Sequence, residues 1–154
     1  MQIFIERTAA EEGWCEVHFC DLTINELYSI LQLRSNVFVV EQKCAYNDID
    51  GIDLEPNALH VFHSSNAHVN AYGRVYFRED GAHLGRIVCD PKSRGAGLGR
   101  MLLEKLIKAG RSHSDKVVIS AQTYLQDWYT NFGFQATGEP YLDDGIPHID
   151  MTLE

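Results

Sequence analysis

The sequence predicts a mixed α/β fold in which helices cover one central, mostly antiparallel sheet. Strand-like and helix-like segments follow the order strand, helix, three strands, helix, strand, helix, two strands. Short polar turns join the three consecutive strands, which is typical of an antiparallel meander. The chain has 154 residues, so residues 1–154 are expected to form a single domain.

The N-terminal third predicts a strand, a capped helix and a long loop. Residues 14–22 (WCEVHFCDL) have the composition of a strand. Thr23 and Glu26 form a capping box that opens a helix, whose apolar positions continue towards Phe38. The run VFVVEQ at 37–42 either prolongs this helix or forms a second short one, because its β-branched residues leave both open. Residues 44–57 are rich in Asn, Asp, Gly and Pro and predict a loop.

The middle of the chain predicts the meander and a second helix. The meander strands are residues 59–63, 69–77 and 83–89. A helix follows at 98–109, with Gly110 as its expected C-cap. The apolar face of this helix is predicted to contain Leu98, Met101, Leu102, Leu106 and Ala109.

The C-terminal third predicts one buried strand, one brief helix and two last strands. Residues 116–122 form a short apolar run of the buried type. The brief helix spans residues 125–132 and ends at Gly133. The last strands are residues 134–141 and 148–153, joined by the segment DDGIP.

Charge and composition narrow the possible partners. A net charge of −9 argues against a general nucleic-acid binder, which needs basic surface. Residues 86–116 nevertheless hold eight Lys and Arg against three acids, and residues 41–55 hold five acids and one Lys. This asymmetry favours separate anion-binding and cation-binding regions, although charge runs are often only solvated faces.

Sequence signals for membranes, export and metals are weak. No apolar run is long enough to span a bilayer, and the segment MQIFIERTAAEEGW has no signal-peptide core. We therefore expect a cytoplasmic protein without a membrane partner. The four Cys and seven His show neither CxxC nor HxxxH spacing, so no metal is expected.

A glycine-rich stretch before the second helix is the strongest chemical signal. Gly95, Gly97 and Gly99 alternate between Arg94 and Arg100. Backbone N–H groups at such a turn, together with the helix dipole and the two arginines, predict a phosphate or pyrophosphate site. The alternative is a merely flexible connection. The stretch lacks the GxxxxGK[ST] pattern of a P-loop, and the meander before it does not fit a dinucleotide fold.

The stretch also resembles the Arg/Gln-x-x-Gly-x-Gly/Ala signature of the GNAT N-acetyltransferases. Two further motifs agree with that family: Cys89-Asp90-Pro91 before the stretch, and the run WYTNFGF at 128–134 after it. Residues 33–61 and 143–151 are similar to the ElaA-like branch, so the resemblance covers nearly the whole chain. The chain departs from the pattern at Ala45, where proline is expected, and at Gln122, where asparagine is common.

The resemblance implies a GNAT-like fold with helices on both faces of the sheet and a splayed pair of parallel strands, residues 83–89 and 116–122. Acetyl-CoA, the implied co-substrate, would lie between them. Backbone groups of the first strand would pair with the pantetheine arm, the amides of the glycine stretch would hold the pyrophosphate, and an amide near Val88 would polarise the thioester carbonyl. The Cys89 side chain is favoured as a small core filler over a nucleophile. The implied cofactor-binding residues are Ile87, Val88, Cys89, Arg94, Gly95, Ala96, Gly97, Leu98, Gly99, Arg100 and Gln122.

The resemblance also implies direct transfer of the acetyl group to a primary amine. Tyr129 matches the position whose hydroxyl protonates the CoA sulfur as general acid, with a packed aromatic as the alternative. Glu41, His60 and His148 are the candidates for the general base, and the sequence does not rank them. A non-catalytic acyl-CoA sensor or interaction module on the same fold remains a second possibility.

The sequence leaves the acceptor and the oligomeric state open. The acceptor would be a small-molecule or peptide amine. The acidic residues Asp48, Asp50, Asp53 and Glu55 would suit a cationic acceptor, but they also fit a solvated loop, or one paired with Arg34, Arg74 and Arg86. A homodimer through the last strand is possible by analogy.

Overall fold

The structure, a computed structural model, describes residues 13–154. The expectation about a missing signal-peptide core falls mainly on residues 1–12 and lies outside the described residues. Eight strands form one sheet with the order β1-β2-β3-β4-β5-β8-β6, and β7 pairs with β8 outside this path. The strands are β1 (Trp14–Val17), β2 (Leu59–Ser65), β3 (His68–Arg78), β4 (Gly81–Cys89), β5 (Val117–Gln122), β6 (Gln135–Ala136), β7 (Tyr141–Asp143) and β8 (Ile146–Leu153).

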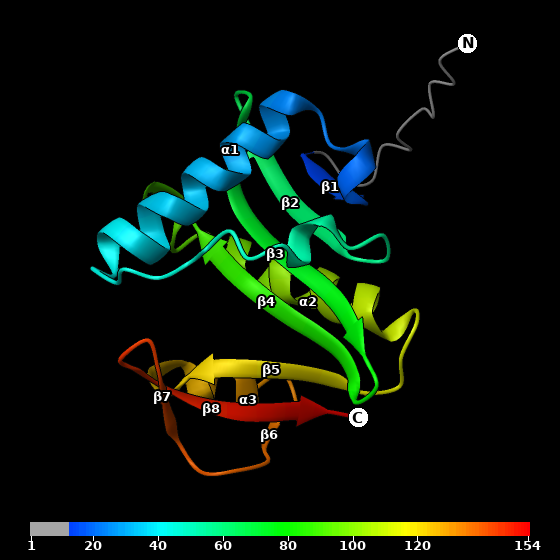
Figure 1. Cartoon of the computed structure of the whole chain (residues 1–154), viewed down its shortest axis with the longest axis vertical. Coiled ribbons are helices and arrows are strands. Elements are labelled where there is room, and N and C mark those ends of the chain that lie inside the picture. Colours follow the sequence, from blue (N-terminus) through cyan, green and yellow to red (C-terminus); the bar gives the residue numbers. More distant parts are fainter. Residues whose placement is uncertain (1–12) are drawn as a thin grey trace.

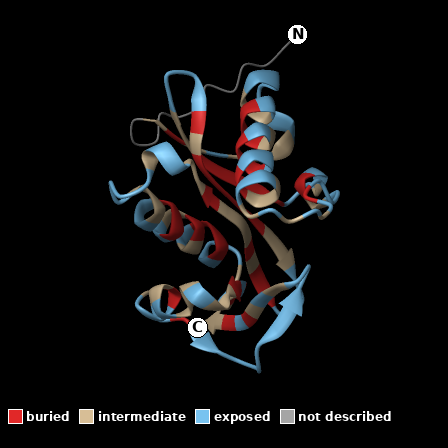
Figure 2. Cartoon of the chain, turned by 90° about the vertical axis from the view of Figure 1, so that its left-hand side faces the viewer, coloured by how far each residue is buried: buried red, intermediate tan, exposed pale blue. Residues whose placement is uncertain are grey.

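The predicted fold class is confirmed. Among the described strands only β4 and β5 pair in parallel, and every other pairing is antiparallel. The helix α1 (Ile24–Arg34) covers one face of the sheet, and α2 (Leu98–Arg111) covers the other (Figures 1 and 2). The short helix α3 (Gln126–Thr130) packs beside β5. No helix of the described chain is long and apolar enough to cross a membrane.

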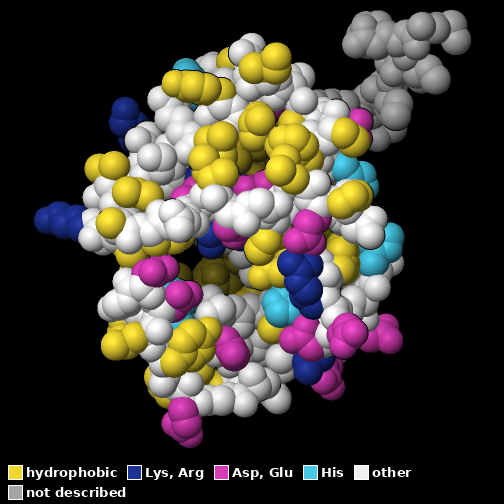
Figure 3. All heavy atoms as spheres, viewed as in Figure 1, with side chains coloured by type: hydrophobic (Ala, Val, Ile, Leu, Met, Phe, Trp, Pro, Cys, Tyr) yellow, Lys and Arg dark blue, Asp and Glu magenta, His cyan; other side chains and the backbone are white. Residues whose placement is uncertain are grey.

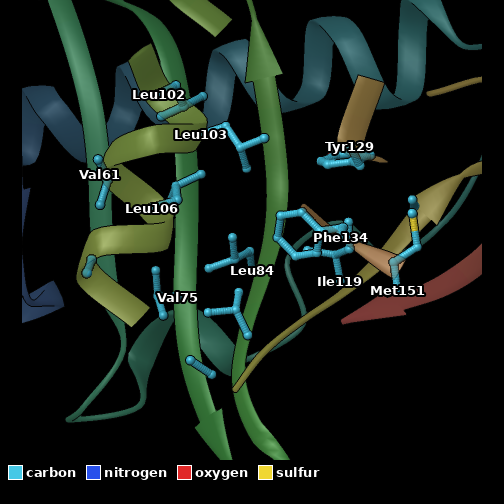
Figure 4. Packing of buried hydrophobic residues seen from close by; sticks show 14 of the residues in the cluster. Val61, Val75, Leu84, Leu102, Leu103, Leu106, Ile119, Tyr129, Phe134 and Met151 are labelled. Carbon is cyan, nitrogen blue, oxygen red and sulfur yellow. The ribbon is translucent and has the colours of Figure 1, made fainter. Parts of the chain in front are cut away.

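The packing of α2 against the meander forms the main core. Leu102, Leu103 and Leu106 are fully buried, and Figure 4 shows them facing the side chains of β2, β3 and β4. Burying each such side chain stabilises the fold by about 2 kcal/mol. Gly73 on β3 permits this close approach, because a Cβ there would lie 2.5 Å from the Leu106 side chain. A smaller core lies on the opposite face, under α1.

The predicted splay of the two parallel strands is confirmed. Their pairing begins at Ala82 with Val117 and ends at Leu84 with Ile119. Beyond Leu84, β4 stays with β3 while β5 stays with β8, so the two strands spread apart (Figure 1). The pairing of β3 with β4 shifts register at the same point, where Arg86 adopts a positive φ of 51°. This β-bulge bends β4 away from β5.

The structure resolves the alternative that the sequence left open after α1. Residues Ser35–Glu41 continue the helix with π-helical hydrogen bonds, such as Gln42 N–H to the Val37 carbonyl. The predicted capping box of Thr23 and Glu26 is present at the start of α1. The wider π turn inserts additional backbone into the last turns of the helix. It thereby carries Glu41 and Gln42 to the opening between β4 and β5.

Several predicted boundaries are wrong. The first strand ends at Val17, and a 3-10 turn, Phe19–Asp21, follows it. The predicted strand 134–141 is two separate strands, β6 and β7, because Pro140 cannot donate to a ladder and Gly138 adds no side chain to pack.

The second helix also differs from the prediction in two respects. It runs to Arg111, so Gly110 is not its C-cap. Gly110 instead lies inside the helix, where a Cβ would meet Ala82 at 3.1 Å. Met101 is 41% exposed and Leu103 is buried in its place, because the buried face is centred on Leu102 and Leu106.

Candidate functional site

The splay of β4 and β5 opens a cavity of about 960 Å³. Its walls come from β4 and β5, from the end of the π-helical segment, from α3 and from the turn between β7 and β8. Figure 3 shows the molecule hollowed between its upper and lower parts, with acidic side chains along the rim. The volume lies within the range of small-molecule pockets.

The glycine stretch forms an open backbone cradle at the start of α2. Gly95 has φ 90°, and Gly97, the N-cap of α2, has φ 80°. A Cβ at either position would meet nothing within 4 Å, so the glycines serve backbone conformation and access rather than packing. No side chain caps the helix at Gly97, which leaves the first N–H groups of α2 available to a ligand. Ala96 lies between the two glycines, and Leu98 is the first residue of α2. These features fit a phosphate group.

The two arginines beside the cradle are placed differently. The Arg94 guanidinium lies 2.8 Å from a carboxylate oxygen of Glu41, and its Nε donates to the Cys89 carbonyl. Arg94 and Glu41 both line the cavity. Arg100 points along α2 to Glu104, with an N–O distance of 3.2 Å, and is exposed. Of these two arginines, Arg94 lines the cavity and Arg100 does not.

The end of β4 forms the wall next to the cradle. Ile87, Val88 and Cys89 line the cavity beyond the last residue pair with β5. Burial raises the pKa of the Cys89 thiol, so it is protonated at neutral pH. Across the opening, Gln122 on β5 donates to Gln42 with an N–O distance of 3.3 Å.

Tyr129 on α3 lies at the cavity with its side chain almost fully enclosed. It is 6% exposed, and its ring packs edge-on against Trp128 and Phe134. Figure 4 shows Tyr129 beside Phe134. Within residues 13–154 the structure gives its hydroxyl no hydrogen bond. Burial raises the pKa of Tyr129 well above its usual value of 10, so the hydroxyl keeps its proton. This geometry gives the cavity a proton donor without a protein partner.

The three candidate bases are not brought together. Glu41 lines the cavity but is ion-paired with Arg94. His148 on β8 also lines it, and its Nδ1 donates to the Ile146 carbonyl at 2.7 Å. Because Nδ1 carries the proton, Nε2 is the basic nitrogen of the neutral ring.

His60 lies apart from the cavity. It is 2% exposed, with its ring nitrogens 2.7 Å from the Tyr72 hydroxyl and 3.0 Å from the Asp53 carbonyl oxygen. It is absent from the cavity lining, and burial lowers its pKa. His60 therefore belongs to a buried polar cluster under the 44–57 loop.

The acidic loop is held in a network with arginines. Arg34, 1% exposed, contacts Asp48 and Asp53 at 2.9 and 2.8 Å. Arg74 contacts Asp50 and Asp53, Arg86 contacts Asp48 and Asp50, and Arg78 contacts Glu55. Burial alone would raise the pKa of Asp50, but the hydrogen bond and charge of Arg74 outweigh it and lower the pKa to about 2. The buried Arg34 and Arg74 and the partly buried Arg86 thus neutralise the three aspartates of the loop.

Sequence analysis missed another set of acids at the cavity. Asp143, Asp144 and Asp150 all line it, and they come from β7, the following turn and β8. The Tyr141 hydroxyl donates to Asp150 at 2.6 Å and also contacts Ser120 on β5. The Asp-Gly pair in DDGIP predicts a tight hairpin, and that hairpin was the available signal for a second acidic region.

Comparison with known proteins identifies the family. The family model for the acetyltransferase (GNAT) domain matches residues 26–154. ElaA of Escherichia coli (strain K12) is 40% identical over 146 residues, which cover 92% of this chain and 95% of ElaA. The crystal structure of Escherichia coli ElaA is similar with a TM-score of 0.87 and 38% identity, over 92% of this chain and 99% of that one.

A second solved structure agrees. The crystal structure of an acyl-CoA N-acyltransferase from Pseudomonas aeruginosa is similar with a TM-score of 0.85 and 42% identity, over 90% of this chain and 97% of that one. Both the glycine cradle and the splayed strands lie within the residues that the family model matches. The chain therefore belongs to the acetyltransferase (GNAT) family, in its ElaA-like branch, and is an acyltransferase.

Proposed function

We propose that this protein transfers an acetyl group from acetyl-CoA to a primary amine by direct attack. The observation that carries the proposal is one continuous cavity between splayed strands, with Arg94 and Gly99 of the phosphate-type cradle and the unpartnered hydroxyl of Tyr129 all on its walls.

The residues present fit acetyl-CoA. The amides from Arg94 to Gly99 would hold the pyrophosphate, because the positive-φ glycines leave the cradle open. Arg94 would add charge-assisted hydrogen bonds after exchanging Glu41 for a phosphate. The unpaired edge of β4 at Ile87–Cys89 would bind the pantetheine arm as an added strand. Gln122 and Gln42 lie across the opening and would border the same arm.

Direct transfer needs an activated acyl group, a neutral amine and a proton donor. When bound, acetyl-CoA supplies the acyl group: the amine nitrogen bonds to the thioester carbon, the C–S bond breaks, and the CoA thiolate leaves. Tyr129 gives its phenolic proton to that thiolate. The backbone N–H of Val88 or Cys89 polarises the carbonyl. His148 Nε2 accepts the proton that the amine loses, and the ring donates at Nδ1 to Ile146. Glu41 is the alternative base once Arg94 turns to phosphate.

Tyr129→Phe tests this function. Removing the hydroxyl takes away the general acid, so we expect kcat with acetyl-CoA and a primary amine to fall about 100-fold or more. Thiol release gives the rate, and calorimetry gives the dissociation constant for acetyl-CoA, which should change less than about twofold. Since the hydroxyl has no partner in the described chain, the melting temperature should not fall.

Tyr28→Phe is the matched control, because Tyr28 is 71% exposed on α1 and does not line the cavity. Full turnover by Tyr129→Phe across pH would overturn the general-acid assignment. Acetyl-CoA binding without turnover over a broad amine panel would instead support a non-catalytic acyl-CoA sensor.

A further inference from the structure

We propose that the acceptor is a primary amine carrying a second cationic group, held by an acidic wall that consists of Asp143, Asp144 and Asp150. The inference rests on the proposed function and names the substrate class of the same site. The acidic wall is a different surface from the 44–57 loop, because arginines already neutralise the aspartates of that loop.

The charges on the cavity wall do not balance. Arg74 and Arg86 line the cavity, but their guanidinium groups are held by the aspartates of the loop. Arg94 is held by Glu41, and Asp80 is held by His83 at 2.6 Å.

The three aspartates of the acidic wall differ from these paired side chains. None of its three aspartates has an ion-pair partner among residues 13–154, and all three line the cavity. This end of the cavity therefore carries uncompensated negative charge, which raises the local concentration of cations.

Local structure fixes the wall in place. Asp144 and Gly145 have φ of 48° and 77°, and Asp143 pairs with Ile146 across the turn. Two positive-φ residues between paired strands define a type I′ hairpin, for which Asp-Gly is a preferred sequence. The Cys44 thiol donates to the Asp144 carbonyl at 3.5 Å and ties the turn to the segment after the π helix. Asp150 is held by the Tyr141 hydroxyl.

A second observation points to a ligand in the same cavity. Tyr129 is 6% exposed and lines the cavity, yet the described chain offers its hydroxyl no hydrogen-bond partner. The side chain is more than nine-tenths buried, but its hydroxyl is not among the fully buried polar atoms that lack a partner, so it is reached from the cavity and can bond to a ligand there. The amine that reacts near Tyr129 must be neutral, so attraction to the wall requires a second group that stays charged. The wall also repels acceptors that carry a carboxylate.

Three acceptors with the same four-carbon chain test the inference: 1,4-diaminobutane, 1-aminobutane and 4-aminobutanoate. At saturating acetyl-CoA and low salt, we expect kcat/KM for the diamine to exceed that of the monoamine about tenfold, with the amino acid lowest. Raising the ionic strength to about 0.5 M should narrow this gap, because salt screens exposed charges.

Substitutions in the wall should reduce the diamine preference. In the double variant Asp143→Asn with Asp144→Asn, and in Asp150→Asn, the ratio of kcat/KM for diamine over monoamine should fall about threefold or more. Asn tolerates positive φ, so the hairpin should persist, and circular dichroism checks the fold. Glu139→Gln removes one negative charge, as Asp150→Asn does, at an exposed position that does not line the cavity, and it should keep the wild-type ratio.

Each result separates the inference from the function on which it rests. Equal kcat/KM for diamine and monoamine, or an unchanged ratio in the wall variants, would overturn the acidic wall and leave the transferase intact. Calorimetry with 1,4-diaminobutane alone provides a readout without turnover. Diamine binding that the wall variants lose, with no turnover of any amine, would support the cation site and overturn the proposed function.

Discussion

Arg94 and Glu41, 53 positions apart in the sequence, form an ion pair with an N–O distance of 2.8 Å across the mouth of the cavity. One belongs to the glycine cradle and the other ends the π-helical segment. The sequence predicted Arg94 as a phosphate ligand and Glu41 as a possible base. In this structure the Arg94 guanidinium and the Glu41 carboxylate are therefore each held by the other.

Glu41→Gln should strengthen acetyl-CoA binding. The substitution frees Arg94 for phosphate, and an exposed ion pair is worth up to about 1 kcal/mol, which corresponds to an affinity gain of at most about fivefold. Calorimetric titration with acetyl-CoA measures this change. Glu139→Gln, away from the cradle, should leave the affinity unchanged. Weaker binding by Glu41→Gln would show that Glu41 supports the cradle rather than competing for Arg94.

Gly97→Glu should abolish acetyl-CoA binding at the cradle. The site has open space for a Cβ but a φ of 80°, and the new carboxylate would face the anion site at the start of α2. We expect the dissociation constant to rise about 100-fold or more. Gly138→Glu is the matched control, because Gly138 also has open space, but lies outside the cavity. Wild-type affinity in Gly97→Glu would disprove the phosphate cradle.

His148→Gln and His60→Gln should fail in different ways. His148 lines the cavity with a free Nε2, so its loss should lower kcat about 100-fold with little change in stability. Replacing His60 disrupts hydrogen bonds with Tyr72 and Asp53, and should lower the free energy of unfolding by about 2 kcal/mol. Steady-state kinetics and urea unfolding of both variants check this. The reverse pattern would make His60 the base.

Acid should destabilise the protein in two stages. Burial lowers the pKa of His60 below its ordinary 6.5, so the unfolded state binds the proton first, and stability falls as the pH drops below 6.5. Burial opposes both shifts, but Arg74 lowers the pKa of Asp50 to about 2, and Arg34 together with Arg74 lowers the pKa of Asp53 below 3.8. Both contributions to stability are present above pH 3.8; that of Asp50 is lost as the pH falls towards 2, and that of Asp53 is lost below pH 3.8.

Urea unfolding between pH 8 and pH 2 measures both stages. In His60→Gln the first stage should disappear, while the second should remain. A free energy of unfolding that does not change between pH 7 and pH 5 would contradict the assignment of His60 as a buried neutral ring. Asp115→Asn, at an exposed position, is the control for the second stage.

Local signals predicted the parts of the site that lie close together in sequence. The alternation of glycines between Arg94 and Arg100 predicted the cradle, and the Thr23–Glu26 capping box predicted the start of α1. Each of these features depends on a few consecutive residues, so the local sequence is enough to predict it.

The remaining parts depend on pairs far apart in the chain. The contacts of Arg34 with Asp53 and of Cys44 with Asp144 follow from tertiary packing, which residue spacing does not encode. The sequence therefore left the role of the 44–57 loop open and did not point to the acidic wall. The π-helical hydrogen bonds after Arg34 were also not predicted. The β-branched residues at 37–42 fit both a prolonged first helix and a second short helix.

The pairing of β4 with β5 ends after three residue pairs. It therefore divides the sheet into a first part, β1 to β4, and a second part that consists of β5, β6, β7 and β8. The glycine cradle and the free edge of β4 lie with the first part and α2, whereas the β7–β8 hairpin belongs to the second. Substitutions in that hairpin are thus largely decoupled from the cradle. An engineer could vary the hairpin of this scaffold while leaving the glycine cradle and β4 untouched.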